Sequence, residues 1–111
     1  MRGGVVKLWQ RIHLDQVHAR QQALDELFQR VSAVATGYDV RALPFGSYAT
    51  KRVDATSDLD VAFPGDITRE VQLGILKDLA ALSRESGIEI DVVFEAETPE
   101  FFGEALHADP V

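Results

Sequence analysis

Residues 45–63 read FGSYATKRVDATSDLDVAF, and the interpretation of the whole chain starts from this stretch. A β-compatible segment ends at Gly46-Ser47, and a second one ends at Pro64-Gly65. Both endings are typical of strands that run into turns. The sequence therefore predicts two short strands, Tyr38 to Phe45 and Leu59 to Phe63, joined by a polar loop from Tyr48 to Ser57.

Helical patterns surround these strands. Apolar residues recur at spacings of three, four and seven from about Leu14 to Ala35, and residues before Leu14 can extend this helix. A second helix is expected from Thr68 to Ser86, and a third from the Thr98-Pro99 cap to about Leu106. Between them, alternation from Ile88 to Phe94 predicts a strand with one buried face. This order indicates an α/β (α+β) fold, with helices packed on a small mixed sheet and residues 1–111 forming one domain.

Composition excludes several classes of protein. The 111 residues carry 18 acidic and 11 basic side chains, a net charge of −7, which disfavours stable binding to nucleic acid. The absence of cysteine excludes disulfides, thiolate zinc sites and a cysteine nucleophile. No apolar run reaches the roughly 18 residues of a membrane helix, and the first residues are too polar for a signal peptide. We therefore expect a cytoplasmic protein that does not enter membranes.

Three carboxylates are the candidate chemical groups. Asp58 and Asp60 are two residues apart at the start of a strand, so they project from one face while Leu59 points into the core. Asp91 lies on another predicted strand, which can bring a third carboxylate alongside. Adjacent like charges repel unless a cation lies between them. Oxygen donors of this kind suit Mg²⁺, which also recruits the phosphates of a substrate.

Gly46 and Ser47 supply a second feature. A glycine at the end of a strand lets the backbone approach a ligand closely, and successive N–H groups in such a turn, with the Ser47 hydroxyl, can hold phosphate oxygens. A metal on carboxylates beside a phosphate-binding turn indicates phosphoryl or nucleotidyl transfer.

The motif Phe45-Gly46-Ser47, followed eleven residues after Ser47 by Asp58-Leu59-Asp60 and later by Asp91, resembles the nucleotidyltransferase signature of the DNA polymerase beta superfamily. The size of the chain and its leading helix are similar to the minimal nucleotidyltransferase (MNT) proteins, which often act as antitoxins beside HEPN-domain toxins. The resemblance covers about Leu14 to Leu106. One difference is that Thr50-Lys51 follows Ala49, whereas many relatives have Ala-Arg-Gly, so Lys51 or Arg52 would have to replace that arginine.

The resemblance implies a polymerase-beta-like fold and a role for each motif residue. Gly46 and Ser47 would bind the triphosphate of ATP, and Asp58 and Asp60 would bind two Mg²⁺ ions. Asp91 would help to hold the catalytic metal and orient or deprotonate the attacking hydroxyl. The implied reaction transfers AMP from ATP to a tyrosine of a partner HEPN toxin, within a hetero-oligomer.

Two alternatives stay open. One is a nucleotidyltransferase that acts on a small molecule such as an aminoglycoside, although those enzymes usually need a second domain for which this chain has no room. The other is a non-catalytic antitoxin that acts by direct binding. Among the remaining residues, we expect Tyr48 to pack against the first helix, and Lys51 and Arg52 to lie in a solvated loop. Phe101 and Phe102 are adjacent, so they cannot both enter one core, and one of them is a candidate for a partner-binding surface.

Overall fold

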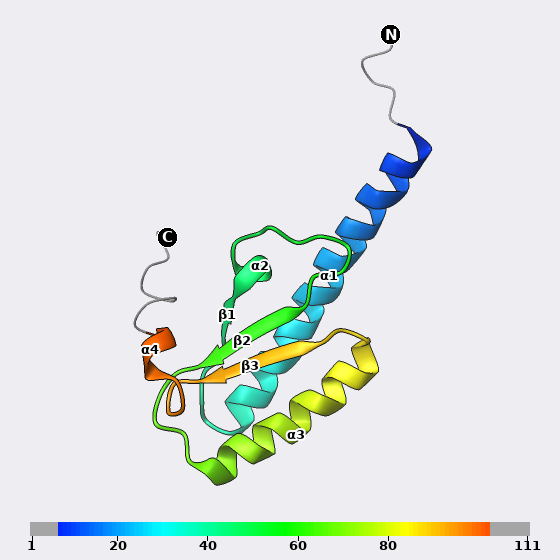
Figure 1. The fold of residues 1–111 in the computed structure, drawn as a ribbon. Helices are drawn as coiled ribbons and strands as arrows, with labels where there is room; N and C mark the ends of the chain where they lie inside the picture. Colours follow the sequence, from blue (N-terminus) through cyan, green and yellow to red (C-terminus); the bar gives the residue numbers. More distant parts are fainter. Residues whose placement is uncertain (1–6, 103–111) are drawn as a thin grey trace.

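The structure is a computed structural model that describes residues 7–102, in which a three-stranded sheet carries two long helices on one face (Figure 1). The helices are α1 (Leu8–Gly37), α2 (Gly46–Ala49), α3 (Arg69–Ser86) and α4 (Pro99–Phe101), and the strands are β1 (Leu43–Phe45), β2 (Leu59–Phe63) and β3 (Ile90–Phe94). The strand order is β1-β2-β3, with β1 antiparallel and β3 parallel to β2. The mixed α+β class is confirmed, and the direction of β3, which sequence left open, is parallel.

The core lies between the sheet and the two long helices. Alternate residues of β2, namely Leu59, Val61 and Phe63, are fully buried and belong to one apolar cluster with α1 and α3. Phe63 also stacks on Phe94 of β3, with 5.3 Å between ring centroids. Full burial of each such side chain contributes roughly 1.5–3 kcal/mol. The opposite face of β2, which carries Asp60, is therefore turned away from α1 and α3.

The ends of α3 follow their sequence signals. Thr68 is the N-cap, and its hydroxyl accepts a hydrogen bond from the backbone N–H of Val71 at 3.3 Å. At the other end Gly87 adopts the left-handed conformation with φ of 74°, which glycine tolerates without strain. The second predicted helix is thus confirmed at both boundaries.

The strand predicted from Tyr38 is too long, because only Leu43–Phe45 pairs with β2. The preceding residues instead wrap the end of α1, with the N–H of Val40 donating to the carbonyl of Ala35 at 2.9 Å and Asp39 at φ of 62°. The predicted start of β3 at Ile88 is also early. The carbonyl of Ile88 accepts a hydrogen bond from the hydroxyl of Ser83 at 2.7 Å, so this residue completes the turn after α3.

The first helix begins at Leu8, so residues before Leu14 extend it as the sequence allowed. The predicted loop differs, because the short helix α2 covers its start. Nothing in the sequence between Gly46 and Ala49 marks a helix. The last predicted helix is seen as Pro99–Phe101, and its continuation to Leu106 lies outside the described residues.

Gly74 of α3 packs against Tyr38, the residue that follows α1. The ring of Tyr38 lies over Gly74, where a Cβ atom would come within 2.7 Å of the tyrosine hydroxyl oxygen and 3.0 Å of Cε1. The Tyr38 hydroxyl donates a hydrogen bond to Oδ2 of Asp78 at 3.0 Å. Gly74 is therefore required by packing, although glycine inside a helix is otherwise unfavourable.

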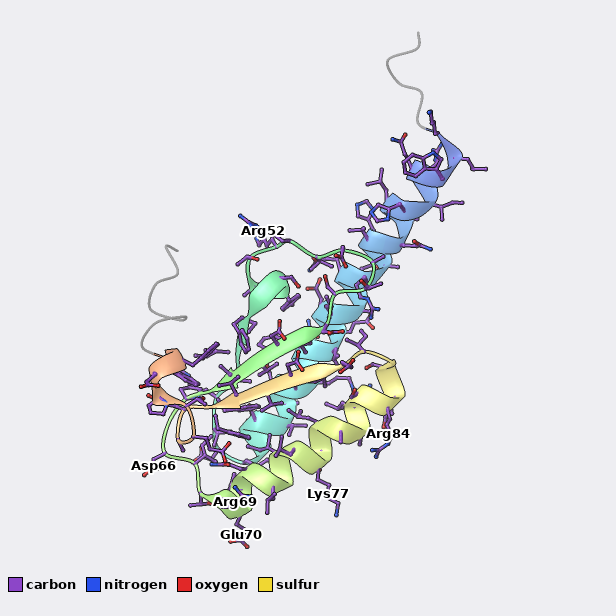
Figure 2. The ribbon with its side chains drawn as sticks, in the orientation of Figure 1. Arg52, Asp66, Arg69, Glu70, Lys77 and Arg84 are labelled. Carbon is purple, nitrogen blue, oxygen red and sulfur yellow. The ribbon has the colours of Figure 1, made fainter. Side chains whose placement is uncertain are left out.

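The outer face of α3 is charged, and Figure 2 shows Arg69, Glu70, Lys77 and Arg84 pointing away from the sheet. Arg69 also approaches Glu97 at 3.4 Å in an exposed ion pair. Among residues 7–102, no helix has the length and apolar character needed to cross a membrane.

Candidate active site

Two of the predicted carboxylates are brought together by the parallel ladder between β2 and β3. Asp60 and Asp91 are Cα partners in this ladder, and Phe45 is the partner of Asp60 on the other side. Because directly paired residues project from the same face of a sheet, these three side chains share the face opposite α1 and α3. The predicted convergence of Asp91 on Asp60 is therefore seen in the structure.

The environment of Asp60 disfavours its charged form. Partial burial, a hydrogen bond with Asp91 and the nearby charges of Asp91 and Asp58 together raise the pKa of Asp60 from 3.8 to about 6. Burial is the largest cause, followed by the hydrogen bond to Asp91. The charge of Asp58 is the smallest of these causes, and Asp58 itself is exposed. All three aspartates thus belong to one electrostatic neighbourhood.

Gly46 lies directly against this neighbourhood. It adopts φ of 74°, and a Cβ atom placed on it would overlap Oδ2 of Asp60 and lie 3.0 Å from Cγ. Only glycine fits both the conformation and the space. The turn that starts α2, with Ser47 as its next residue, is consequently held beside the carboxylates, as the sequence predicted for Gly46 and Ser47.

A turn before β2, which sequence reasoning missed, holds Asp58 in place. Oδ1 of Asp54 accepts hydrogen bonds from the N–H of Thr56 at 2.9 Å, the Thr56 hydroxyl at 3.2 Å and the Ser57 hydroxyl at 3.3 Å. The bond from the Thr56 N–H is the main cause that lowers the pKa of Asp54. Ser57 is buried and Leu59 is fully buried, so Asp58 between them is directed toward solvent. An Asp followed by Thr and Ser is a typical signal for such a turn.

Tyr48 anchors α2 to α1, which agrees with the packing role predicted for it. Its ring lies 5.8 Å from that of Phe28, and its hydroxyl donates a hydrogen bond to Oδ1 of Asp25 at 2.8 Å. Burial, the hydrogen bond and the charge of Asp25 raise the pKa of Tyr48 to about 12. Lys51 and Arg52, farther along, are exposed, and Figure 2 shows Arg52 pointing away from the sheet.

Aromatic residues border the carboxylates on the same face of the sheet. Phe101 of α4 meets Phe45 edge to face at 4.9 Å, and Phe102 meets Phe101 at 5.8 Å. Phe102 is buried whereas Phe101 is only half-buried. The two neighbouring phenylalanines are therefore buried to different extents, and Phe101 is the one at the edge of the site.

The donor atoms of the site suit a hard cation, but they do not form a finished cage. Among residues 7–102, no group of three or more histidine, aspartate and glutamate side chains is arranged to hold a metal ion. Asp60 and Asp91 instead share a hydrogen bond, with Asp58 alongside. Carboxylate oxygens are ligands that Mg²⁺ accepts, and binding one here requires the three side chains to turn toward a common point.

A hollow of about 580 Å³ lies elsewhere, at the far end of the sheet, between residues 38–41 and 64–68. None of the predicted site residues lines it. The carboxylates lie on the sheet face itself.

Comparison with known proteins agrees with the geometry. No curated protein and no solved structure matches the chain. The family model described as "Nucleotidyltransferase domain" matches residues 21–108, a span that contains the glycine-serine turn and all three aspartates. The match covers most of the chain. The chain therefore belongs to the nucleotidyltransferase domain family.

Proposed function

We propose that this nucleotidyltransferase transfers AMP from ATP to a hydroxyl, using Mg²⁺ held by Asp58, Asp60 and Asp91. The observation that carries the proposal is the pairing of Asp60 with Asp91 across the parallel ladder, directly beside the Gly46 turn. Paired carboxylates that repel one another are costly to keep unless they serve a bound cation. Membership of the family supports nucleotidyl transfer in general.

Each residue has a separate task in this proposal. The backbone N–H groups that follow Gly46 and the Ser47 hydroxyl bind phosphate oxygens of the nucleotide. Asp58 and Asp60 provide oxygen ligands, and Mg²⁺ would supply neutralisation of the charge that develops on the triphosphate. Asp91 orients the acceptor hydroxyl and accepts its proton. The acceptor oxygen forms a bond to the α-phosphorus, the bond from that phosphorus to the bridging oxygen breaks, and pyrophosphate leaves.

The acceptor that we propose is a tyrosine on a HEPN-type toxin, which the transfer would silence. This part of the proposal depends on the resemblance to the minimal nucleotidyltransferases. Mass spectrometry of a co-expressed toxin partner tests it, because AMP attachment adds a defined mass to one tyrosine-containing peptide. Finding the adduct on a small molecule, or finding neutralisation without any adduct, would support one of the two alternatives instead.

Transfer of labelled AMP from ATP tests the proposed chemistry. Asp58→Asn and Asp60→Asn should each abolish transfer, because an amide is a poor ligand for Mg²⁺ and carries no charge. Asp66→Asn is the matched control, since Asp66 is exposed and lies at the far end of the sheet (Figure 2). Unchanged transfer by either site variant would refute the proposed roles. Isothermal titration of ATP with and without Mg²⁺ then separates a catalytic protein from one that only binds a partner.

A further inference from the structure

The N-terminal half of α1 leaves the body of the protein (Figure 1). Buried residues in this helix begin only at Leu24, whereas Leu8, Trp9 and Ile12 are 74%, 64% and 50% exposed. A helix of 30 residues is about 45 Å long, so a large part of it projects past the core. Soluble monomers seldom leave several large apolar side chains together in water. This arm patch, consisting of Leu8, Trp9 and Ile12, is typical of a surface that another surface covers.

A hollow that could receive such side chains lies on the same helix. Ala19 and Ala23 follow Ile12 by seven and eleven residues, so all three lie on one face of α1. Ala19 and Ala23, together with Ala55 and Ile88, line a hollow of about 450 Å³. Its rim is held in place where Nε of Arg20 donates to the carbonyl of Ala55 at 3.0 Å. Gln16, Arg20, Thr56 and Ser86 complete the lining of this alanine hollow, so small apolar side chains lie among polar ones.

We propose that two copies of the chain pair through antiparallel α1 helices, with the arm patch of each copy in the alanine hollow of the other. The large side chains and the small ones occupy successive parts of one helix face. Reversing the direction of a second α1 therefore places large opposite small at both ends. A two-fold interface requires such a self-complementary surface, because every contact is repeated with the two copies exchanged.

Charge also favours a second copy as the partner. Residues 7–14 of the arm carry Lys7 and Arg11 and no acidic side chain, whereas residues 21–111, which supply Ala23, Ala55 and Ile88 to the hollow, carry seven basic and 17 acidic side chains. Each basic arm would lie against the acidic body of its partner. Pairing of opposite charge guides the orientation of an interface even where it adds little affinity.

The oligomeric state of the full chain tests the proposal, with two matched variants. Ile12 and Leu14 are both 50% exposed, but two residues along a helix turns the side chain by about 200°. Ile12→Glu should weaken the dimer by roughly 10- to 100-fold, because the change acts in both copies and each half-exposed Ile12 loses about half of a full side-chain burial. Leu14→Glu should leave the dimer unchanged. Sedimentation velocity from about 1 to about 100 μM covers the range of ordinary weak dimers.

Trp9 provides a second measurement, because it is the only tryptophan of the chain. Its emission should shift to shorter wavelength as the wild-type dimer forms, and should stay unshifted in Ile12→Glu at the same concentrations. Circular dichroism confirms that each variant is folded. A wild-type chain that stays monomeric throughout, or equal effects of the two substitutions, overturns the proposal. So does coverage of Trp9 by a different protein while the chain itself is monomeric.

Discussion

Replacing Asp60 with asparagine should stabilise the metal-free protein at neutral pH even though it removes activity. The pKa of Asp60 is raised from 3.8 to about 6 in the folded state. Between about pH 4 and 6, the folded protein therefore keeps a proton that the unfolded chain has already released. Stability falls as the pH rises through this window and stays lower above it. Asparagine carries no charge at any pH, so the variant escapes this loss.

The size of the effect follows from the shift. The difference between a pKa of 3.8 and one of about 6 for Asp60 corresponds to roughly 3 kcal/mol of free energy. Asp60 is only partly buried, and water screens a good part of that interaction, so we expect about 1–1.5 kcal/mol. For a domain of this size the gain raises the melting temperature by roughly 5–10 °C. Asparagine also keeps a donor for the hydrogen bond to Asp91, as protonated Asp60 does.

Thermal unfolding in EDTA at pH 4 and pH 8 checks this reasoning. The two proteins should melt at nearly the same temperature at pH 4, and Asp60→Asn should melt higher at pH 8. Asp66→Asn, at an exposed position at the far end of the sheet, should show no such pH-dependent gain. A variant that is less stable than wild type at pH 8, or a gain of equal size at both pH values, would refute the electrostatic account.

Adding Mg²⁺ should reverse the order of the two proteins. A ligand that binds only the folded state raises its stability with concentration, so Mg²⁺ with ATP should raise the melting temperature of wild type. Asp60→Asn lacks one of the proposed ligands and should gain much less. The same residue would thus be unfavourable without its cation and favourable with it.

Two glycines give the remaining predictions. Gly46→Ala should abolish transfer of labelled AMP, because the new Cβ overlaps the carboxylate of Asp60 at a positive φ; activity near wild type would contradict the close approach. Gly74→Ala should lower the free energy of unfolding by roughly 1–3 kcal/mol, since the methyl group overlaps the ring of Tyr38. Its control is Gly37→Ala, where nothing lies within 4 Å, and urea titration should show no loss there.

The sequence predicted helices and strands best where residues close together in the chain determine their boundaries. The turn signal at Pro64-Gly65 marked Leu59–Phe63 as a strand, and the Thr68 cap and Gly87 marked both ends of α3. It failed where tertiary contacts decide. Residues 38–42 have a β-compatible composition, but the N–H groups of residues 38–40 bond to the end of α1, and pairing with β2 starts only at Leu43. The helix α2 likewise depends on Tyr48 bonding to Asp25, a contact between residues far apart in the chain.

The candidate site shows the same division. Asp58 and Asp60 could be placed on one face from their spacing alone, but the register that sets Asp60 opposite Asp91 depends on packing of the whole sheet. The turn around Asp54 was encoded locally and could have been recognised from its Asp, Thr and Ser residues. The contact between Gly46 and Asp60 could not, because it joins two separate strand ends.

Two features that are unfavourable for folding meet at one point of this molecule. Gly46 is held at a positive φ, and it lies against Asp60, whose charged form is disfavoured by burial and by Asp91. Neither feature helps the core, which consists of apolar residues on the opposite face of β2. Local conflicts of this kind are expected where function, rather than stability, selects the residues. The coincidence of both at the strand pair therefore favours a ligand site there over a merely solvated surface.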